Sequence, residues 1–217
     1  MSRHDFVRDE EVEVISSTIR LAGRLRVPDH AKGQVVFAHG SGSSRNSPRN
    51  VAVAKVLNDA GFATLLFDLL TEAEASNRDN VFDIEMLGRR LLDATIWLRS
   101  QEDFLESPFG YFGASTGAAA ALWAAADPKS KVSAVVSRGG RADMAGSKLE
   151  SVQAPTLLIV GGLDDVVIDL NRQAQSKMHC ENELVIIPGA THLFEEPGTL
   201  EQVANLARDW FLKYLLQ

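Results

Sequence analysis

Short runs of continuous apolar residues, separated by amphipathic stretches, are the feature that most constrains the fold of this chain. In these runs the apolar residues are mostly consecutive and do not alternate regularly with polar ones. This pattern is typical of β-strands whose two faces are both covered by other elements, as the strands of parallel sheets usually are. Six such runs follow one another, at residues 35–38, 63–67, 109–112, 132–136, 156–160 and 184–187.

Helical patterns separate these runs. Ser47 before Pro48 predicts one helix start, and Asp83 before an apolar stripe predicts another. Thr199 and Gln202 have the spacing of a capping box at the start of the last helix. Strands that alternate with helices favour an α/β fold, a mainly parallel sheet with helices on both faces.

Two β-prone runs precede this pattern, at residues 12–15 and 19–27, and they favour an antiparallel pair. The expected sheet therefore has eight strands. With 217 residues and no linker or repeat, residues 1–217 are predicted to form a single domain.

Composition narrows the classes of partner and location. A net charge of −7 argues against nucleic acid as the main partner, because phosphate binding needs clustered Lys and Arg. It argues weakly against anionic membrane surfaces. One cysteine, Cys180, excludes an internal disulfide and fits a reducing compartment. The first residues lack the apolar stretch of a signal peptide, and no run approaches the roughly 18 apolar residues of a membrane span. We expect a soluble, cytoplasmic protein.

Residues Gly113-Ala114-Ser115-Thr116-Gly117 carry the strongest chemical signal. They join a predicted strand to a predicted helix, which is the context that the G-x-S-x-G nucleophile elbow requires. Glycines on both sides allow a very sharp turn that exposes the serine, and the helix N-terminus faces the charge that develops during attack. A glycine-bearing turn with an incidental serine is the alternative. The context favours Ser115 as a nucleophile.

A serine hydroxyl needs a base, and the base needs an orienting group. His192 directly follows the last predicted strand and is the leading base, although a structural loop histidine is the alternative reading. Asp164 and Asp165 follow the strand before it, in the chain order Ser, Asp, His that this kind of elbow accompanies. We favour Asp164 as the orienting acid and expect Asp165 to cap the following helix. Both could instead be helix-capping acids.

The tetrahedral oxyanion of acyl transfer needs two preorganised donors. One is expected to be the backbone N–H of Thr116, next to the nucleophile. The other is expected from Ser41, in the glycine-containing loop 39–44 after the first buried strand. A flexible turn is the alternative reading of that loop.

In these motifs the chain resembles the α/β-hydrolase superfamily, and within it the dienelactone-hydrolase-like branch. The resemblance implies the α/β-hydrolase fold and carboxylic ester hydrolysis without a cofactor or a metal. Dienelactone hydrolase itself has cysteine where Ser115 stands, so this chain differs in its nucleophile. The matching segments are residues 39–42, 113–117, 161–167 and 189–192.

Many relatives insert a lid after the sixth strand, but residues 138–155 are too few for several helices. We expect no lid domain and an open site bordered by residues 71–80, suited to small acyl substrates. Arg138 follows a strand near this edge. It is interpreted either as a partner for a substrate carboxylate or phosphate, or as a structural arginine tied to a nearby acid.

The predicted function is that of a serine hydrolase that cleaves small carboxylic esters through an acyl-enzyme intermediate. Two alternatives stay open: a thioesterase or acyltransferase on the same triad, and a catalytically silent small-molecule binding protein. A small ester is the expected partner. The sequence does not predict an oligomeric state.

Overall fold

An eight-stranded sheet forms the centre of the computed structural model, which describes residues 6–216, and its strand order is β1-β2-β4-β3-β5-β6-β7-β8. Strands β3 to β8 run parallel to their neighbours, whereas β1 pairs antiparallel with β2 and β2 with β4. The predicted mainly parallel sheet is confirmed. The strands are β1 (Phe6–Ser16), β2 (Ile19–Pro28), β3 (Gln34–Ala38), β4 (Ala63–Phe67), β5 (Phe109–Ala114), β6 (Ala134–Arg138), β7 (Thr156–Gly161) and β8 (Asn182–Ile187).

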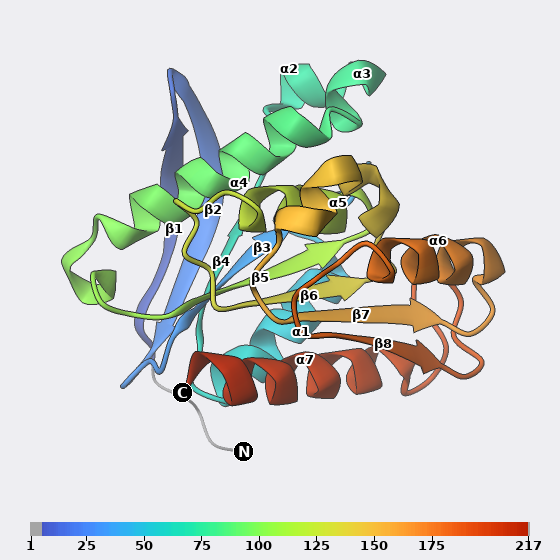
Figure 1. Ribbon diagram of the computed structural model, residues 1–217. Helices are drawn as coiled ribbons and strands as arrows, with labels where there is room; N and C mark the ends of the chain where they lie inside the picture. The colour runs from blue at the N-terminus through green and yellow to red at the C-terminus, as the bar shows by residue number, and fades with distance from the viewer. Residues whose placement is uncertain (1–5, 217) are drawn as a thin grey trace.

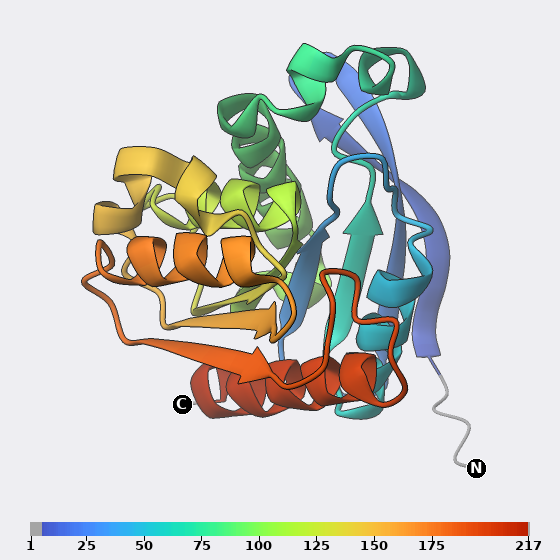
Figure 2. The same ribbon diagram turned by 90° about the vertical axis from the view of Figure 1, so that its right-hand side faces the viewer.

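Helices cover both faces of the sheet, as Figures 1 and 2 show. Helices α4, α5 and α6 lie on one face, and α1 and α7 lie together on the other. The helical segments are α1 (Pro48–Asp59), α2 (Glu72–Ala75), α3 (Arg78–Val81), α4 (Ile84–Arg99), η1 (Glu102–Phe104), α5 (Thr116–Ala125), η2 (Ala142–Ser151), α6 (Asp165–Gln175) and α7 (Thr199–Leu215).

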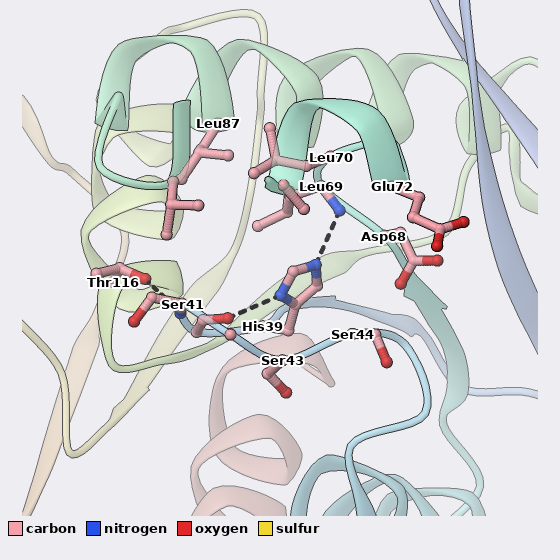
Figure 3. Close-up of a pocket in the computed structure, with 14 residues that line it drawn as sticks. His39, Ser41, Ser43, Ser44, Asp68, Leu69, Leu70, Glu72, Leu87 and Thr116 are labelled. Atoms are coloured by element: carbon pink, nitrogen blue, oxygen red, sulfur yellow. Dashed lines mark hydrogen bonds between the residues drawn. The ribbon is translucent and has the colours of Figure 1, made fainter. Parts of the chain in front are cut away.

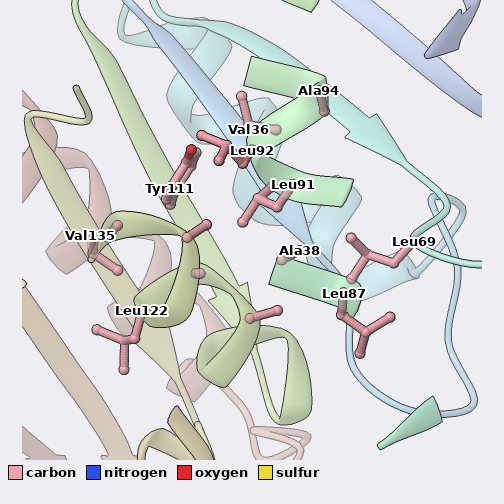
Figure 4. Packing of buried hydrophobic residues seen from close by; sticks show 14 of the residues in the cluster. Val36, Ala38, Leu69, Leu87, Leu91, Leu92, Ala94, Tyr111, Leu122 and Val135 are labelled. Atoms are coloured by element: carbon pink, nitrogen blue, oxygen red, sulfur yellow. The ribbon is translucent and has the colours of Figure 1, made fainter. Parts of the chain in front are cut away.

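Two apolar clusters fill the spaces between the sheet and these helix layers. The larger one lies beneath α4 and α5 and includes Leu91, Tyr111 and Leu122 (Figure 4). The other lies against α1 and α7. Every residue of β3 to β7 is buried, which explains the continuous apolar runs, whereas the edge strands β1 and β8 are partly exposed.

The N-termini of the helices confirm two of the predicted caps and contradict a third. Ser47 accepts a hydrogen bond from the Asn50 amide with Pro48 at the first helical position, and Asp83 caps α4 through the Met86 amide at 2.9 Å. The capping box at Thr199 is wrong. Gly198 occupies the N-cap of α7 with φ 80°, and the Thr199 hydroxyl instead donates to the Glu196 carbonyl at 2.8 Å.

No lid covers the carboxyl edge of the sheet in the described part of the chain. The segment after β6 forms only short 3₁₀ turns, with a reversal at Gly146, where φ is 60°. The expected loop at 71–80 contains the two short helices α2 and α3, which stand over the N-terminal end of α4. Within residues 6–216, no helix is both long enough and apolar enough to span a bilayer.

Candidate active site

The predicted nucleophile lies on a strained turn between β5 and α5. Ser115 has φ 52° and ψ −122°, a positive-φ conformation that non-glycine residues rarely adopt outside functional sites. A Cβ on Gly113 would lie 2.4 Å from the Cα of Ala118. A Cβ on Gly117 would lie 2.2 Å from the carbonyl oxygen of Ala38. Both positions therefore require glycine, as the sequence pattern predicts.

Neighbouring backbone holds this turn in place. The Ser115 amide donates to the Arg138 carbonyl at 3.2 Å, and the Ser115 carbonyl accepts from the Arg141 amide at 3.1 Å. A Cβ on Gly40 would lie 2.9 Å from the Cβ of Ser115, so the loop after β3 passes directly beside the serine. The Ser115 hydroxyl is half-buried and has no hydrogen-bond partner among residues 6–216. It is therefore free to meet a substrate.

His192 and Asp164 form a short hydrogen bond at the same sheet edge. The imidazole Nδ1 donates to Asp164 Oδ2 at 2.6 Å. Asp164 is 17% exposed and His192 is 37% exposed, so the acid is shielded while the ring faces solvent. A carboxylate on Nδ1 leaves Nε2 unprotonated in the neutral ring, which is the form a general base needs.

The expected cap at Asp165 is wrong. Asp164 itself occupies the N-cap position of α6, but its side chain makes no capping hydrogen bond. Asp165 is the first helical residue. The carboxylate of Asp164 is engaged by His192 instead, so the position that would normally cap the helix serves the imidazole.

Packing between loops fixes the position of His192. The Leu163 amide donates to the Ala190 carbonyl at 2.9 Å, which joins the Asp164 loop to the His192 loop. A Cβ on Gly139 would lie 3.6 Å from His192 Cε1. Gly139 follows Arg138, the residue whose carbonyl holds Ser115. His192 and Ser115 therefore border the same end of β6, although no hydrogen bond joins their side chains in the described chain. Catalytic hydrogen bonds often tighten only when substrate binds.

The two residues expected to supply oxyanion donors contact each other. Thr116 is the first residue of α5, so its amide has no acceptor within the helix. The Ser41 amide donates to the Thr116 hydroxyl at 2.9 Å (Figure 3). The hydroxyl of Thr116 therefore occupies the single N–H of Ser41, a contact that the sequence analysis did not anticipate. The Ser41 amide lies beside the nucleophile, but its N–H must turn away from Thr116 before it can donate to an oxyanion.

His39 supports this loop in a role that the sequence analysis missed. Its Nε2 accepts from the Leu69 amide at 2.9 Å, and its Nδ1 donates to the Gly40 carbonyl at 2.9 Å (Figure 3). Burial lowers the pKa of the imidazole below 6.5, which favours the neutral ring that these two bonds require. His39 thus ties the loop after β3 to the loop after β4. Its place directly before Gly40, at the end of a buried strand, was the available signal.

A cavity of about 370 Å³ opens beside the loop after β3 (Figure 3). Its polar wall includes Ser41 and Thr116, and its apolar wall comes from the loop after β4 and from α2, α3 and α4. This wall comprises Leu69, Leu70, Ala75, Val81 and Leu87. The cavity therefore joins the candidate oxyanion donors to an apolar chamber.

Arg138 points away from this cavity. It lies on the face of the sheet that α1 and α7 cover, with its guanidinium 6.0 Å from the centre of the Phe194 ring. It is 6% exposed and makes no ion pair with residues 6–216. The interpretation that an acid of the protein ties it down is therefore wrong.

Other reactive groups lie apart from the site. Among the described residues, no three His, Cys, Asp or Glu side chains cluster in a way that could hold a metal ion. Cys180 is half-buried, and burial raises the pKa of its thiol, which disfavours the reactive thiolate. His179 is exposed, as expected.

Comparison with known proteins places the chain among relatives. Residues 21–214 match the model of the Dienelactone hydrolase family. A dienelactone hydrolase from Anabaena variabilis, known from a crystal structure, is 53% identical, with 96% of this chain and 98% of that one covered, and superposes with a TM-score of 0.92. The protein Est1E from Butyrivibrio proteoclasticus is 18% identical over 94% of this chain and 98% of its own, with a TM-score of 0.78, which supports the fold alone.

A protein of Mycobacterium tuberculosis that carries the name of a phosphoribosyl transferase is 64% identical over 209 residues. The match includes 96% of this chain but only 47% of the relative. The chain therefore spans about half the length of this relative. The α/β-hydrolase fold and the resemblance to the dienelactone-hydrolase-like branch are confirmed by the family and structure matches.

Proposed function

The chain belongs to the dienelactone hydrolase family, and on this premise we propose that it is a serine hydrolase that cleaves small carboxylic esters through an acyl-enzyme intermediate. The observation that carries the proposal is the 2.6 Å bond between His192 and Asp164, at the sheet edge where Ser115 holds a positive φ. Strain at a serine beside an oriented imidazole is typical of an activated nucleophile.

In the proposed acylation step, Ser115 Oγ attacks the ester carbonyl carbon while His192 Nε2 takes its proton. Asp164 keeps the Nδ1 proton in place and stabilises the imidazolium that forms. The carbonyl oxygen becomes an oxyanion, which accepts a hydrogen bond from the Thr116 amide. A second hydrogen bond comes from the Ser41 amide, whose N–H exchanges the Thr116 hydroxyl for the oxyanion. The intermediate then collapses, the bond to the alcohol oxygen breaks, and His192 returns its proton to the leaving alcohol.

Deacylation repeats the sequence with water. His192 removes a proton from a water molecule, the resulting hydroxide attacks the acyl carbon, and the same amides hold the second oxyanion. Release of the carboxylic acid returns the proton to Ser115 Oγ. Each step needs only groups of this chain and water, so the proposal includes no cofactor.

The cavity supports a small substrate. Because Ser41 and Thr116 line it, a carbonyl held by their amides would direct one substituent of the ester into the apolar chamber. A volume of about 370 Å³ lies at the lower end for small-molecule sites, which bury most of their ligand's surface. Short aliphatic or small aromatic groups fit this description better than long acyl chains.

The test is the variant Ser115→Ala, assayed with p-nitrophenyl butyrate. We expect kcat to fall by at least about 10⁴-fold, because the nucleophile is lost while the fold is kept. Ser133→Ala, just before β6 and at the opposite end of the sheet, is the matched control and should retain activity. A fluorophosphonate label should map to the peptide that contains Ser115. Wild-type turnover by Ser115→Ala would refute the mechanism.

Two alternatives use the same geometry. A thioesterase or acyltransferase would partition the acyl-enzyme toward an added thiol or alcohol, which product analysis detects. A binding protein without turnover would bind esters yet release no burst of p-nitrophenol. The mycobacterial relative that carries a phosphoribosyl transferase name is about twice as long as this chain, which matches only 47% of it, so that name supports no transferase activity for this chain.

A further inference from the structure

Arg138 is a buried charge at the end of β6. Its side chain shares a face with Ala134 and Val136, both part of the apolar cluster under α1 and α7. The residue is 6% exposed, and the Phe194 ring lies 6.0 Å from its guanidinium. Phe194 is itself 2% exposed and lies two residues after His192. Arg138 therefore lies beneath the loop that carries the candidate base.

This guanidinium has no counter-charge. No carboxylate of residues 6–216 forms an ion pair with it, and its Nε is fully buried without a hydrogen-bond partner. Burial lowers the pKa of Arg138 to about 10, so the group still carries its charge near neutral pH. Arginines are almost never fully buried unless paired, because desolvation of a charge is costly. No acidic group of residues 6–216 supplies that pairing.

Arg49 brings a second positive charge to the same place. It is the second residue of α1, and the acid that it contacts, Glu195, directly follows Phe194. Its positive charge also contributes to the lowered pKa of Arg138. Its Nε is also buried without a partner, while its Nη1 contacts the Glu195 carboxylate at 3.3 Å. Glu195 is 65% exposed, so its charge is screened by water. Of these two guanidiniums, only that of Arg49 has a carboxylate partner, and this partner is exposed.

The site is open to a small ion. Arg49 is 31% exposed at its side chain. The terminal nitrogens of Arg138 make no hydrogen bond within residues 6–216 and are not among the fully buried atoms, so they keep a path to solvent. Guanidinium groups present paired donors that match the geometry of carboxylate and phosphate oxygens. A carboxylate or phosphate group therefore has the chemistry that these donors fit.

We propose that Arg138 and Arg49 form a binding site for a carboxylate or phosphate group, closed on one side by Phe194. The bound anion supplies the counter-charge that the protein lacks. Because Phe194 belongs to the His192 loop and the Arg138 carbonyl holds Ser115, occupancy of this site also steadies the candidate active site. The anion is either a free ion or a charged group of the substrate. The second case rests on the proposed function.

The test measures the melting temperature of the protein with increasing inorganic phosphate, against sodium chloride of equal ionic strength. We expect phosphate to raise the melting temperature of the wild type. Arg138→Met and Arg49→Met should each need at least ten times more phosphate for the same rise in melting temperature. Arg172→Met removes an exposed arginine of α6 and should respond as the wild type does. Ser115→Ala should also keep the response, which separates this test from failure of the proposed catalysis.

Arg138→Met carries a second readout. Without phosphate it should melt at or above the wild-type temperature, because it removes an uncompensated buried charge and keeps the side-chain volume. If this variant does not fold, Arg49→Met still tests the site, because Arg49 lies at the surface end of it. Absence of any phosphate response in the wild type, or a full response in both variants, would overturn the proposal.

A pair of esters of similar size identifies the source of the anion. The hemisuccinate ester of p-nitrophenol carries a carboxylate, whereas the butyrate ester is neutral. If the anion is a substrate group, the ratio of kcat/KM for the charged ester to that for the neutral ester should fall at least tenfold in Arg49→Met. An unchanged ratio, together with the phosphate response, assigns the site to a free anion.

Discussion

Replacing Gly40 with alanine should separate catalysis from folding in this protein. A Cβ at this position would lie 2.9 Å from the Cβ of Ser115 and 3.1 Å from the carbonyl oxygen of Ala114. The φ of Gly40 is not positive, so alanine meets no backbone strain there. The only conflict is contact with the nucleophile turn. The loop after β3 must therefore move away from Ser115, and it takes the Ser41 amide with it.

The size of the effect follows from these distances. The nearest contact is about 0.5 Å short of the 3.4 Å at which ordinary van der Waals contact begins. Oxyanion donors act at 2.7–3.1 Å, so a displacement of that size takes the Ser41 amide out of range. Loss of one such donor costs about 10²- to 10³-fold in kcat, and a partial displacement should cost roughly 10- to 100-fold. Overpacking of this kind costs about 1–3 kcal/mol of stability, or roughly 2–12 °C in melting temperature.

The assay is steady-state hydrolysis of p-nitrophenyl butyrate, together with thermal unfolding of each variant. Gly146→Ala is the control, since Gly146 has φ 60° but a Cβ on it would meet no atom within 4 Å, and it lies in η2, away from the Ser115 turn. It should lose stability through backbone strain and keep wild-type kcat. The reasoning fails if Gly40→Ala retains kcat within twofold, or if Gly146→Ala loses as much.

Two further predictions concern the histidines. Asp164→Asn should lower kcat for p-nitrophenyl butyrate by about 10³- to 10⁴-fold at an unchanged melting temperature, because an amide no longer enforces the Nδ1–H form of His192; activity near wild type would remove Asp164 from the mechanism. Burial lowers the pKa of His39, so the unfolded state binds more protons than the folded state, and the stability from this neutral ring is present above pH 6.5 and lost as pH falls below it. His39→Gln should flatten this dependence, by up to about 1.4 kcal/mol per pH unit, in urea unfolding between pH 5 and 8; an identical slope in both proteins would contradict it.

The nucleophile turn was predictable because its requirements fall on glycines at a fixed spacing around the serine. Gly113 and Gly117 are required by contacts within a few residues or with the adjoining strand, and such requirements are visible in the sequence as a fixed spacing. The buried strands were predictable for a similar reason, since coverage on both faces favours apolar residues along most of each strand. The partly exposed edge strands have a weaker apolar pattern in the sequence than the buried strands. Strand β1 extends from Phe6, well before the predicted run at residues 12–15.

Contacts between loops distant along the chain were not predictable. In the sequence, Asp164 and Asp165 are equally suitable as the cap of the following helix. Only the position of His192 in space decides which of the two carboxylates binds the imidazole. The bond from the Ser41 amide to the Thr116 hydroxyl joins two strand ends that the sequence separates by 75 residues. Whether Arg138 has a counter-charge depends on the side chains of all the segments that pack around it. No local pattern encodes any of these.

The two proposals together predict which end of a substrate is apolar and which end is acidic. The apolar cavity lies on the α4 side of the sheet edge, next to Ser41 and Thr116, whereas the Arg138 and Arg49 site lies on the α1 and α7 side, beneath the His192 loop. Ser115 stands between them, at the end of β5. An ester with one apolar substituent and one acidic substituent would match both sides at once. The acidic substituent of such a substrate would lie beside the two arginines, on either the acyl part or the alcohol part of the ester. Comparing esters that carry a carboxylate on the acyl part with esters that carry it on the alcohol part determines which part faces the arginines.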